Sequence, residues 1–238
     1  MDNGFSVVTS TKRPWEIKNI VDNYDRQSFK QKQLIVIIHH NKSYKHKIEA
    51  QYSKRGDIIV EQLPENISLG NCLNYGYSKA RYKYIAKFDD DDYYGPHYLQ
   101  EMYDTFLTND CDIVCKASIF YYLLSEKKLV LIPYLIKENS AARRGSGATI
   151  CITQEVFRKM QYSDLRRGVD IDFFIRARKL ELSIFSTTSY NFLCIRSEDE
   201  MKHTWQIAAK SLESKGDKVF GVKEMELEDA RKFVSNDE

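Results

Sequence analysis

The apolar residues of this chain come in short runs separated by polar stretches that favour helix. Strands are predicted at residues 5–9, 34–38, 57–60 and 82–88, and helices at 11–27, 45–54 and 69–80. The run at 34–38 (LIVII) is apolar throughout, as expected of a strand buried on both faces of a parallel sheet. Strands that alternate with helices in this way predict an α/β domain with crossover helices.

The second half of the chain loses this regular alternation. Helices are predicted at 97–107, 153–160 and within 167–181, strands at 112–124, 128–132, 148–152 and 184–187, and a polar loop at 139–147. No Pro/Gly-rich linker and no repeat divides the chain. We therefore predict a single domain at 1–210, followed by a charged helical tail at 211–238.

Composition narrows the class of protein. The 238 residues are 42% hydrophobic and 29% charged, with a formal net charge of +2, so nothing global indicates a nucleic-acid partner. No apolar run reaches the roughly 18 residues that span a bilayer, and the N-terminus lacks a signal-peptide pattern. We expect a cytoplasmic protein without a transmembrane segment. Five cysteines with no Cys-x-x-Cys pair favour reduced thiols.

Four consecutive carboxylates at residues 89–92 follow the predicted strand at 82–88. Adjacent like charges repel, and a divalent cation would remove that cost, because carboxylate oxygens suit Mg²⁺ or Mn²⁺. A helix with Pro96 at its first position follows. The carboxylates are therefore expected at the C-terminal edge of a sheet, where open α/β sheets bind ligands.

Two other interpretations of this cluster remain. One is a solvated acidic turn. The other is a calcium-binding EF-hand loop, in which Asp90, Asp92, Gly95 and Glu101 would occupy positions 1, 3, 6 and 12. Tyr94 at position 5, Pro96 at position 7 and a preceding strand instead of a helix count against the EF-hand.

The order of motifs resembles the family 2 glycosyltransferases of the GT-A fold, in particular small bacterial or phage-type nucleotide-sugar transferases. The segments that carry the likeness are TSTKRP at 9–14, NISLG at 66–70, LNYG at 73–76, FDDDD at 88–92, GSGA at 145–148 and GVDIDF at 168–173. The likeness covers roughly residues 5–200. It implies a single GT-A domain with a Rossmann-like, mostly parallel central sheet flanked by helices, a nucleotide-binding half at 1–95, an acceptor half at 96–210 and a helical C-terminus.

The resemblance also implies roles for individual residues. Asp91 is expected to bind Mn²⁺ or Mg²⁺ directly, and Asp89 or Asp90 to contact the donor ribose or a metal-bound water, with Asp89 a second metal ligand. A bridging cation would stabilise the negative charge that grows on a nucleoside diphosphate leaving group. His203 is expected to complete the metal shell. The further donor-binding candidates are Thr9, Thr11, Arg13, Asn41, Asn74 and Arg144.

The chain departs from the family pattern after the second strand, at His39, His40 and Asn41. The family usually has acidic residues there, one of which pairs with the imide of uracil. Asn41 or His40 is able to hydrogen-bond a base with a different preference, so the nucleotide base stays open, although a UDP-linked donor is favoured. Consecutive strand residues point to opposite faces, so no joint histidine metal site is expected.

Asp170 and Asp172 are the candidates for the general base. In inverting transfer a carboxylate removes the proton of the acceptor hydroxyl as that oxygen attacks the anomeric carbon. Asp170 matches the acidic position of the family motif best, and Asp172 either caps the helix or acts as the base. The alternative is that both acids only favour the helix N-terminus through its dipole.

These features predict a metal-dependent inverting glycosyltransferase that moves a sugar from a nucleotide-sugar donor to a glycan or cell-surface-polymer acceptor. A nucleotidyltransferase would also use carboxylates and Mg²⁺, but it normally needs a glycine-rich loop after the first strand, and residues 10–13 (STKR) contain no glycine. A non-catalytic nucleotide- or glycan-binding module is the third alternative. The sequence leaves a homodimer open.

Overall fold

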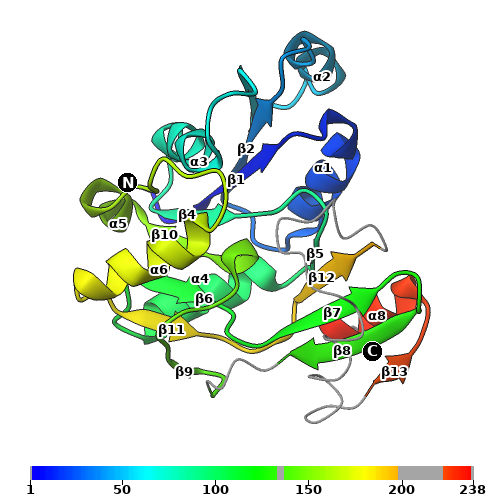
Figure 1. The fold of residues 1–238 in the computed structure, drawn as a ribbon, viewed down its shortest axis with the longest axis vertical. Helices are drawn as coiled ribbons and strands as arrows, with labels where there is room; N and C mark the ends of the chain where they lie inside the picture. The colour runs from blue at the N-terminus through cyan, green and yellow to red at the C-terminus, as the bar shows by residue number, and fades with distance from the viewer. Residues whose placement is uncertain (1, 133–136, 198–221, 237–238) are drawn as a thin grey trace.

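The central feature of the fold is a mixed sheet of eight strands. The computed structural model describes residues 2–132, 137–197 and 222–236. The strand order is β3 (Ile58–Leu63), β2 (Lys32–His39), β1 (Phe5–Thr11), β4 (Tyr84–Lys87), β10 (Cys151–Thr153), β6 (Ile113–Cys115), β11 (Ile184–Ser186) and β9 (Ser140–Ala141). Figure 1 shows this sheet running through the middle of the molecule. The predicted α/β class with a mostly parallel central sheet is confirmed.

The N-terminal half is the regular part of this sheet. β1 pairs in parallel with β2 on one side and β4 on the other, and β2 pairs in parallel with β3. Crossover helices connect these strands: α1 (Ile17–Arg26), α2 (Lys45–Gln51) and α3 (Leu69–Ser78). The chain order reverses between β1 and β4, because β2 and β3 extend the sheet on one side and β4 extends it on the other. Such a switch point is where open α/β sheets bind ligands.

Helices cover both faces of the sheet, and alternate strand residues supply the two cores. On one face Val7 and Val36 pack with α1 and with α4 (Tyr98–Thr108). On the other face Val8 and Ile37 pack with α3, α5 (Gln154–Lys159) and α6 (Val169–Lys179). Because successive side chains of a strand point to opposite faces, and both faces are covered by helices, the run at 34–38 in β2 is apolar throughout. We refer to the second face as the α3 face.

A second sheet of five strands lies beside the first (Figure 1). Its order is β13 (Lys223–Glu224), β8 (Lys128–Ile132), β7 (Ile119–Leu123), β12 (Phe192–Arg196) and β5 (Tyr93–Tyr94). Helix α8 (Leu227–Ser235) buries Ala230 and Val234 against this sheet, with Phe120 and Leu193 in the same cluster. Part of the segment that the sequence assigned to a tail thus packs onto the body of the protein.

The single strand predicted at 112–124 is wrong. The chain forms β6 in the first sheet, breaks at residues 116–118 and continues as β7 in the second sheet. Side-chain hydroxyls satisfy the backbone at the break: Lys116 N donates to Thr149 Oγ1 at 3.0 Å, and Ala117 N donates to Ser186 Oγ at 2.9 Å. A continuous apolar run therefore divides between two sheets at the point where side-chain hydroxyls from distant segments, instead of a neighbouring strand, accept hydrogen bonds from its backbone N–H groups.

Two smaller predictions also need correction. The helix expected from residue 11 begins later, because β1 extends to Thr11 and is followed by a 3-10 turn, η1 (Pro14–Glu16), before α1. The strand expected at 148–152 is a 3-10 turn, η2 (Gly147–Thr149), followed by β10. Within the described parts of the chain, no helix is long and apolar enough to cross a membrane.

Candidate functional site

The loop after β1 meets the carboxylate cluster after β4. Arg13 Nε donates to Asp90 Oδ2 at 3.1 Å, and its Nη2 pairs with Asp90 Oδ1 and, at 2.9 Å, with Asp91 Oδ2. Thr11 Oγ1 donates to Asp90 and accepts from the backbone N–H of Arg13 at 2.8 Å. Two segments almost 80 residues apart in the sequence are therefore joined at the switch point of the sheet.

Helix α1 holds the backbone of the cluster. Asn19 Nδ2 donates to the carbonyl of Asp90 at 2.8 Å, and Asn23 Nδ2 donates to the carbonyl of Asp92 at 2.8 Å. The carboxylate of Asp92 accepts from the backbone N–H of Ile195 in β12 at 3.1 Å. The four carboxylates thus have different surroundings: Asp92 is buried inside the protein, and its contacts tie the cluster to the second sheet.

The cluster carries negative charge that the protein only partly balances. Burial raises the pKa of Asp90 and of Asp91 above the usual range, although Arg13 acts in the opposite direction on both. Burial, followed by the charges of Asp91 and Asp89, raises the pKa of Asp92 well above the usual range. Ionised carboxylates at this position are therefore unfavourable on their own, and an added cation would favour them.

Lys87, the last residue of β4, connects this cluster to α6. Its side chain is buried, and its Nζ forms an ion pair with Asp89. Burial lowers the pKa of Lys87, but the interactions with Asp89, Tyr162 and Asp170 together raise it by more than burial lowers it. The pKa of Lys87 therefore lies above that of an ordinary lysine. The charges of Asp89 and Asp170 therefore act on the same ammonium group, and the two carboxylates belong to one electrostatic neighbourhood.

The two candidate bases at the start of α6 have different environments. Gly147 of η2 approaches Asp170 so closely that a Cβ on this glycine would lie 2.5 Å from Asp170 Oδ2, so only glycine leaves room for the carboxylate. Asp172 Oδ2 accepts from Ser163 Oγ at 2.7 Å and from Arg176 Nε at 2.8 Å. These contacts hold the pKa of Asp172 below its usual range, Ser163 contributing most.

The remaining sequence candidates are spread around this centre. The Asn74 side chain exchanges two 2.8 Å hydrogen bonds with the backbone of Tyr162, which ties α3 to the segment before α6. Asn41 Oδ1 accepts from the backbone N–H of Glu65 at 3.0 Å. Arg144 is exposed in the loop before η2. His203 lies outside the described residues.

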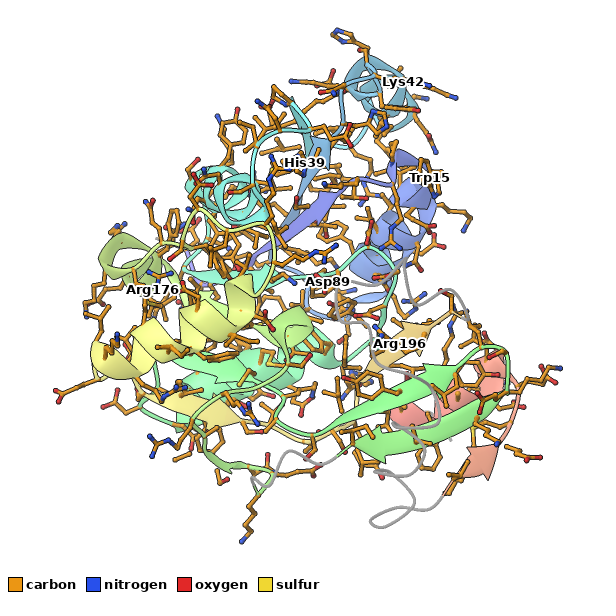
Figure 2. All side chains as sticks on the ribbon, viewed as in Figure 1. Trp15, His39, Lys42, Asp89, Arg176 and Arg196 are labelled. Carbon is orange, nitrogen blue, oxygen red and sulfur yellow. The ribbon has the colours of Figure 1, made fainter. Side chains whose placement is uncertain are left out.

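Two buried polar atoms near the sheet edge have no hydrogen-bond partner within the described parts of the chain. They are Thr9 Oγ1 in β1 and Nε2 of His39 at the end of β2. Buried polar groups are rarely left unpaired, and an unpaired one at a ligand-binding edge indicates a missing partner. Figure 2 labels His39 near β2 and α3, and labels Asp89 closer to the centre of the molecule.

The EF-hand alternative is excluded by the side-chain contacts. Asp90, at position 1 of such a loop, is held by Arg13 and Thr11. Glu101, at position 12, lies in α4 and forms an ion pair with Lys116 at 2.7 Å. The two carboxylates that would have to converge on one calcium ion therefore have separate partners.

The carboxylates of Asp89 and Asp91 would suit an Mn²⁺ or Mg²⁺ ion whose remaining ligands come from a substrate. In residues 2–132, 137–197 and 222–236, no three His, Cys, Asp or Glu side chains are arranged to hold a metal ion. Mg²⁺ is commonly bound through only one or two carboxylates plus the phosphates of a substrate. Asp89 and Asp91, both partly exposed at 37% and 27% of the side chain, match that requirement.

Sequence reasoning missed two residues of this neighbourhood. Lys87 was counted as part of a strand, although a lysine in the apolar run YIAKF directly before the carboxylates is a detectable signal. Tyr94 was used only as evidence against calcium. Its hydroxyl accepts from Asp89 N at 2.8 Å and donates to the carbonyl of Ala148 at 2.7 Å, linking the cluster to the loop around η2.

Comparison with known proteins identifies the family of this chain. The sequence profile of glycosyl transferase family 2 matches residues 6–129, slightly more than half of the chain. No curated protein matches the chain significantly.

Similar solved structures include TarS of S. aureus. Its residues 1–349 superpose with a TM-score of 0.62 at 15% identity, covering 81% of this chain and 60% of that chain. The complex of TarS 1–349 with UDP-GlcNAc gives a TM-score of 0.63 at 15% identity, with 89% and 64% covered. The chain thus spans about three-fifths of the TarS 1–349 length, and at this identity the likeness concerns the fold.

Proposed function

Because the chain belongs to glycosyl transferase family 2, we propose that it transfers a sugar from a nucleotide-sugar donor to a hydroxyl of a glycan or cell-surface polymer, with inversion at the anomeric carbon and dependence on Mn²⁺ or Mg²⁺. The observation that carries the proposal is the acidic cluster at the switch point of the sheet, where Arg13 pairs with Asp90 and Asp91 and Lys87 pairs with Asp89. The candidate base, Asp170, lies at the start of α6.

The acidic cluster supports the donor side of the proposal. Asp91 and Asp89 would hold the metal ion, which when bound neutralises the growing charge of the departing diphosphate. Arg13 contacts both Asp90 and Asp91 and so fixes the loop after β1 against the cluster. That loop also carries Thr9 and Thr11, the candidates for contact with the nucleoside. UDP-GlcNAc, present in a TarS complex, is the first donor to test.

Asp170 is the base that the contacts favour. It lies against the backbone of Gly147 and forms no ion pair with any of the described residues, whereas Asp172 is engaged by Ser163 and Arg176. A carboxylate with a depressed pKa is a weaker proton acceptor, so Asp172 suits a positioning role at the N-terminus of α6. Asp170 would remove the acceptor hydroxyl proton as the oxygen attacks.

Lys87 positions Asp89. Its buried ammonium group forms an ion pair with that carboxylate, and the charge of Asp170 adds to the rise in the pKa of Lys87. The ion pair holds Asp89 in place after the end of β4. Lys87 is accordingly a positioning residue in this proposal.

The proposal is tested with Asp170→Asn, Asp91→Asn and Asp172→Asn, measuring release of nucleoside diphosphate and sugar transfer from UDP-GlcNAc and other nucleotide sugars with Mn²⁺. Loss of a general base should lower kcat about 10²- to 10⁴-fold in Asp170→Asn, with little change in donor affinity. Asp91→Asn should instead weaken donor binding in the presence of Mn²⁺. Asp172→Asn should cost less than Asp170→Asn.

Asp104→Asn is a matched control, because Asp104 is an exposed carboxylate of α4 outside this centre. It should retain full activity. If Asp170→Asn and Asp91→Asn also retain full rates, the assignment of both carboxylates is wrong. If Asp172→Asn loses more activity than Asp170→Asn, the roles of the two acids are exchanged.

A further inference from the structure

The hydroxyl of Tyr94 joins the acidic cluster to the loop that lies against the candidate base. Tyr94 is in β5, two residues after the cluster, and is fully buried. Its Oη accepts from the backbone N–H of Asp89 at 2.8 Å and donates to the carbonyl of Ala148 at 2.7 Å. Burial, followed by the charges of Asp89 and Asp92, raises the pKa of Tyr94 well above its usual range, so the hydroxyl keeps the proton that it donates.

The strand register shows which hydrogen bond this bridge replaces. β4 and β10 pair antiparallel, and at the end of β4 the N–H of Lys87 donates to the carbonyl of Ile150 at 3.0 Å. In such a ladder every second pair of opposite residues is hydrogen-bonded. Continuing the register by two residues brings Asp89 opposite Ala148. Their N–H and carbonyl would therefore bond directly if the ladder continued, but the hydroxyl of Tyr94 lies between them.

The inserted hydroxyl keeps the two segments further apart than the ladder would. A direct N–H···O bond places its heavy atoms at about 2.9 Å. Here two hydrogen bonds in series, of 2.8 and 2.7 Å, separate the nitrogen of Asp89 from the oxygen of Ala148. The hydroxyl thus fixes both where the ladder ends and how far apart the two segments lie beyond it.

The two ends of the bridge belong to different parts of the proposed site. Asp89 is the first carboxylate of the acidic cluster and forms an ion pair with Lys87. Ala148 follows Gly147 in η2, and the backbone of that glycine lies against the carboxylate of Asp170. The hydroxyl therefore connects a candidate metal ligand with the turn that contacts the candidate base.

The ring that carries the hydroxyl is held on several sides. It stacks on Phe88, with ring centroids 3.7 Å apart and ring planes 4° apart, and meets Tyr98 edge to face at 5.0 Å. The backbone N–H of Tyr94 donates to Asn23 Oδ1 at 3.1 Å, and its carbonyl accepts from Gln27 Nε2 at 3.3 Å. A group fixed in this way sets the spacing of its partners, because it has little freedom to follow them.

We propose that Tyr94 is a positioning residue whose hydroxyl is a spacer: it sets the separation between the carboxylates that hold the donor and the base Asp170. This inference rests on the proposed function. Transfer needs the donor at the acidic cluster and the acceptor hydroxyl at the base to meet in one arrangement. A displacement of about 1 Å in such an arrangement is enough to cost about 10²-fold in rate.

Tyr94→Phe removes the spacer oxygen and keeps the ring. The N–H of Asp89 and the carbonyl of Ala148 then either bond directly or lose their partner, and both results change the spacing. The kcat of sugar transfer should fall about 10- to 100-fold. The dissociation constant of the donor's nucleoside diphosphate with Mn²⁺, with UDP as the first ligand in calorimetry, should change less than about threefold, because the donor-side carboxylates are intact.

Tyr98→Phe is the matched control. Tyr98 is fully buried in the same aromatic cluster, and its hydroxyl donates to the carbonyl of Thr149, one residue beyond Ala148, at 3.1 Å. Among the described residues this hydroxyl contacts Thr149 and Cys151 and not the acidic cluster. Tyr98→Phe should lower the midpoint of thermal unfolding about as much as Tyr94→Phe, while its kcat stays within about twofold of the unaltered chain.

Phe88→Leu is a second variant that tests the same spacing. It keeps the hydroxyl of Tyr94 but removes the ring stacked on it, so kcat should fall less than in Tyr94→Phe, again with little change in the affinity for UDP and Mn²⁺. This variant decides the question if Tyr94→Phe does not fold. In that case a fall in kcat with retained affinity supports the spacer, and an unchanged kcat overturns it.

Three results with a folded Tyr94→Phe would overturn the assignment. Full kcat would show that the spacing does not depend on the hydroxyl. An equal loss of kcat in Tyr98→Phe would show that the bridge to Asp89 is not what matters. A loss of nucleotide affinity as large as the loss of kcat would place the effect on donor binding alone. If the unaltered chain transfers sugar from no nucleotide sugar, the proposed function itself is contradicted.

Discussion

The buried ion pair between Lys116 and Glu101 should be a major source of stability, and Lys116→Met tests it. Lys116 is fully buried at the break between β6 and β7, and its Nζ lies 2.7 Å from Glu101 Oε2, 3.1 Å from Thr187 Oγ1 and 3.0 Å from the carbonyl of Thr188. Glu101 also accepts from the backbone N–H and hydroxyl of Thr188. The pair thus ties α4 to the segment between β11 and β12.

The magnitude follows from the geometry. At 2.7 Å the gross attraction is about 6 kcal/mol for an effective dielectric constant of about 20, and the cost of removing both charges from water opposes it. Removal of only Lys116 leaves the Glu101 carboxylate largely buried, since 17% of its side chain is exposed. Breaking one half of such a pair costs about 3–5 kcal/mol. Lys116→Met should therefore lose about that much free energy of unfolding.

Urea denaturation measures this loss, with the slope of the transition as a check that the compactness of both states is unchanged. The double variant Lys116→Met with Glu101→Gln is the control. It removes both charges and retains an amide for Thr188, so it should recover most of the stability. A loss below about 1 kcal/mol in the single variant, or no recovery in the double variant, would refute the reasoning.

Two further predictions concern the N-terminal half. Hydrogen bonds from Arg55 and, after the opposing effect of burial, from Tyr24 hold the pKa of Asp57 at about 2. Because the folded pKa is below the unfolded one, this carboxylate stabilises the fold above about pH 4, and thermal denaturation should show that contribution disappear as the pH falls from about 4 to 2, but not in Asp57→Asn. Gly76→Ala would place a Cβ 2.5 Å from Val8 Cγ1 and should lower the free energy of unfolding in urea by about 1–3 kcal/mol. Gly56→Ala, which has open space around the new Cβ, should lower it far less. Equal losses in the two variants would contradict the packing argument.

The N-terminal half of the fold was predictable because its signals are local. The apolar run at 34–38 and its neighbours gave the order of strands and helices, and β2, α3 and β8 lie where the pattern indicates. The acidic cluster at 89–92 was expected at a sheet edge, and it lies there. Period-two burial and crossover helices depend on neighbours close in sequence, so the pattern of one chain is enough to reveal them.

The second half was harder to predict for the opposite reason. Apart from Asp112, Lys116 and Ser118, the run at 112–124 is apolar, and nothing local shows that it divides between two sheets. The division depends on Thr149 and Ser186, which come from distant segments and satisfy the backbone at the break. β5 was not predicted because a strand of two residues exists only where its partner is present, and that partner is β12, which was not predicted either.

The sequence by itself determined the α/β class, the order of the first strands and the position of four carboxylates at a strand end, because spacing and residue type decide these features. Only the tertiary structure decided how the carboxylates differ. It directed Arg13 to Asp90 and Asp91, buried Lys87 against Asp89, and fixed Asp172 with Ser163 and Arg176. Such differences arise from burial and from partners distant in the sequence, which no local pattern records.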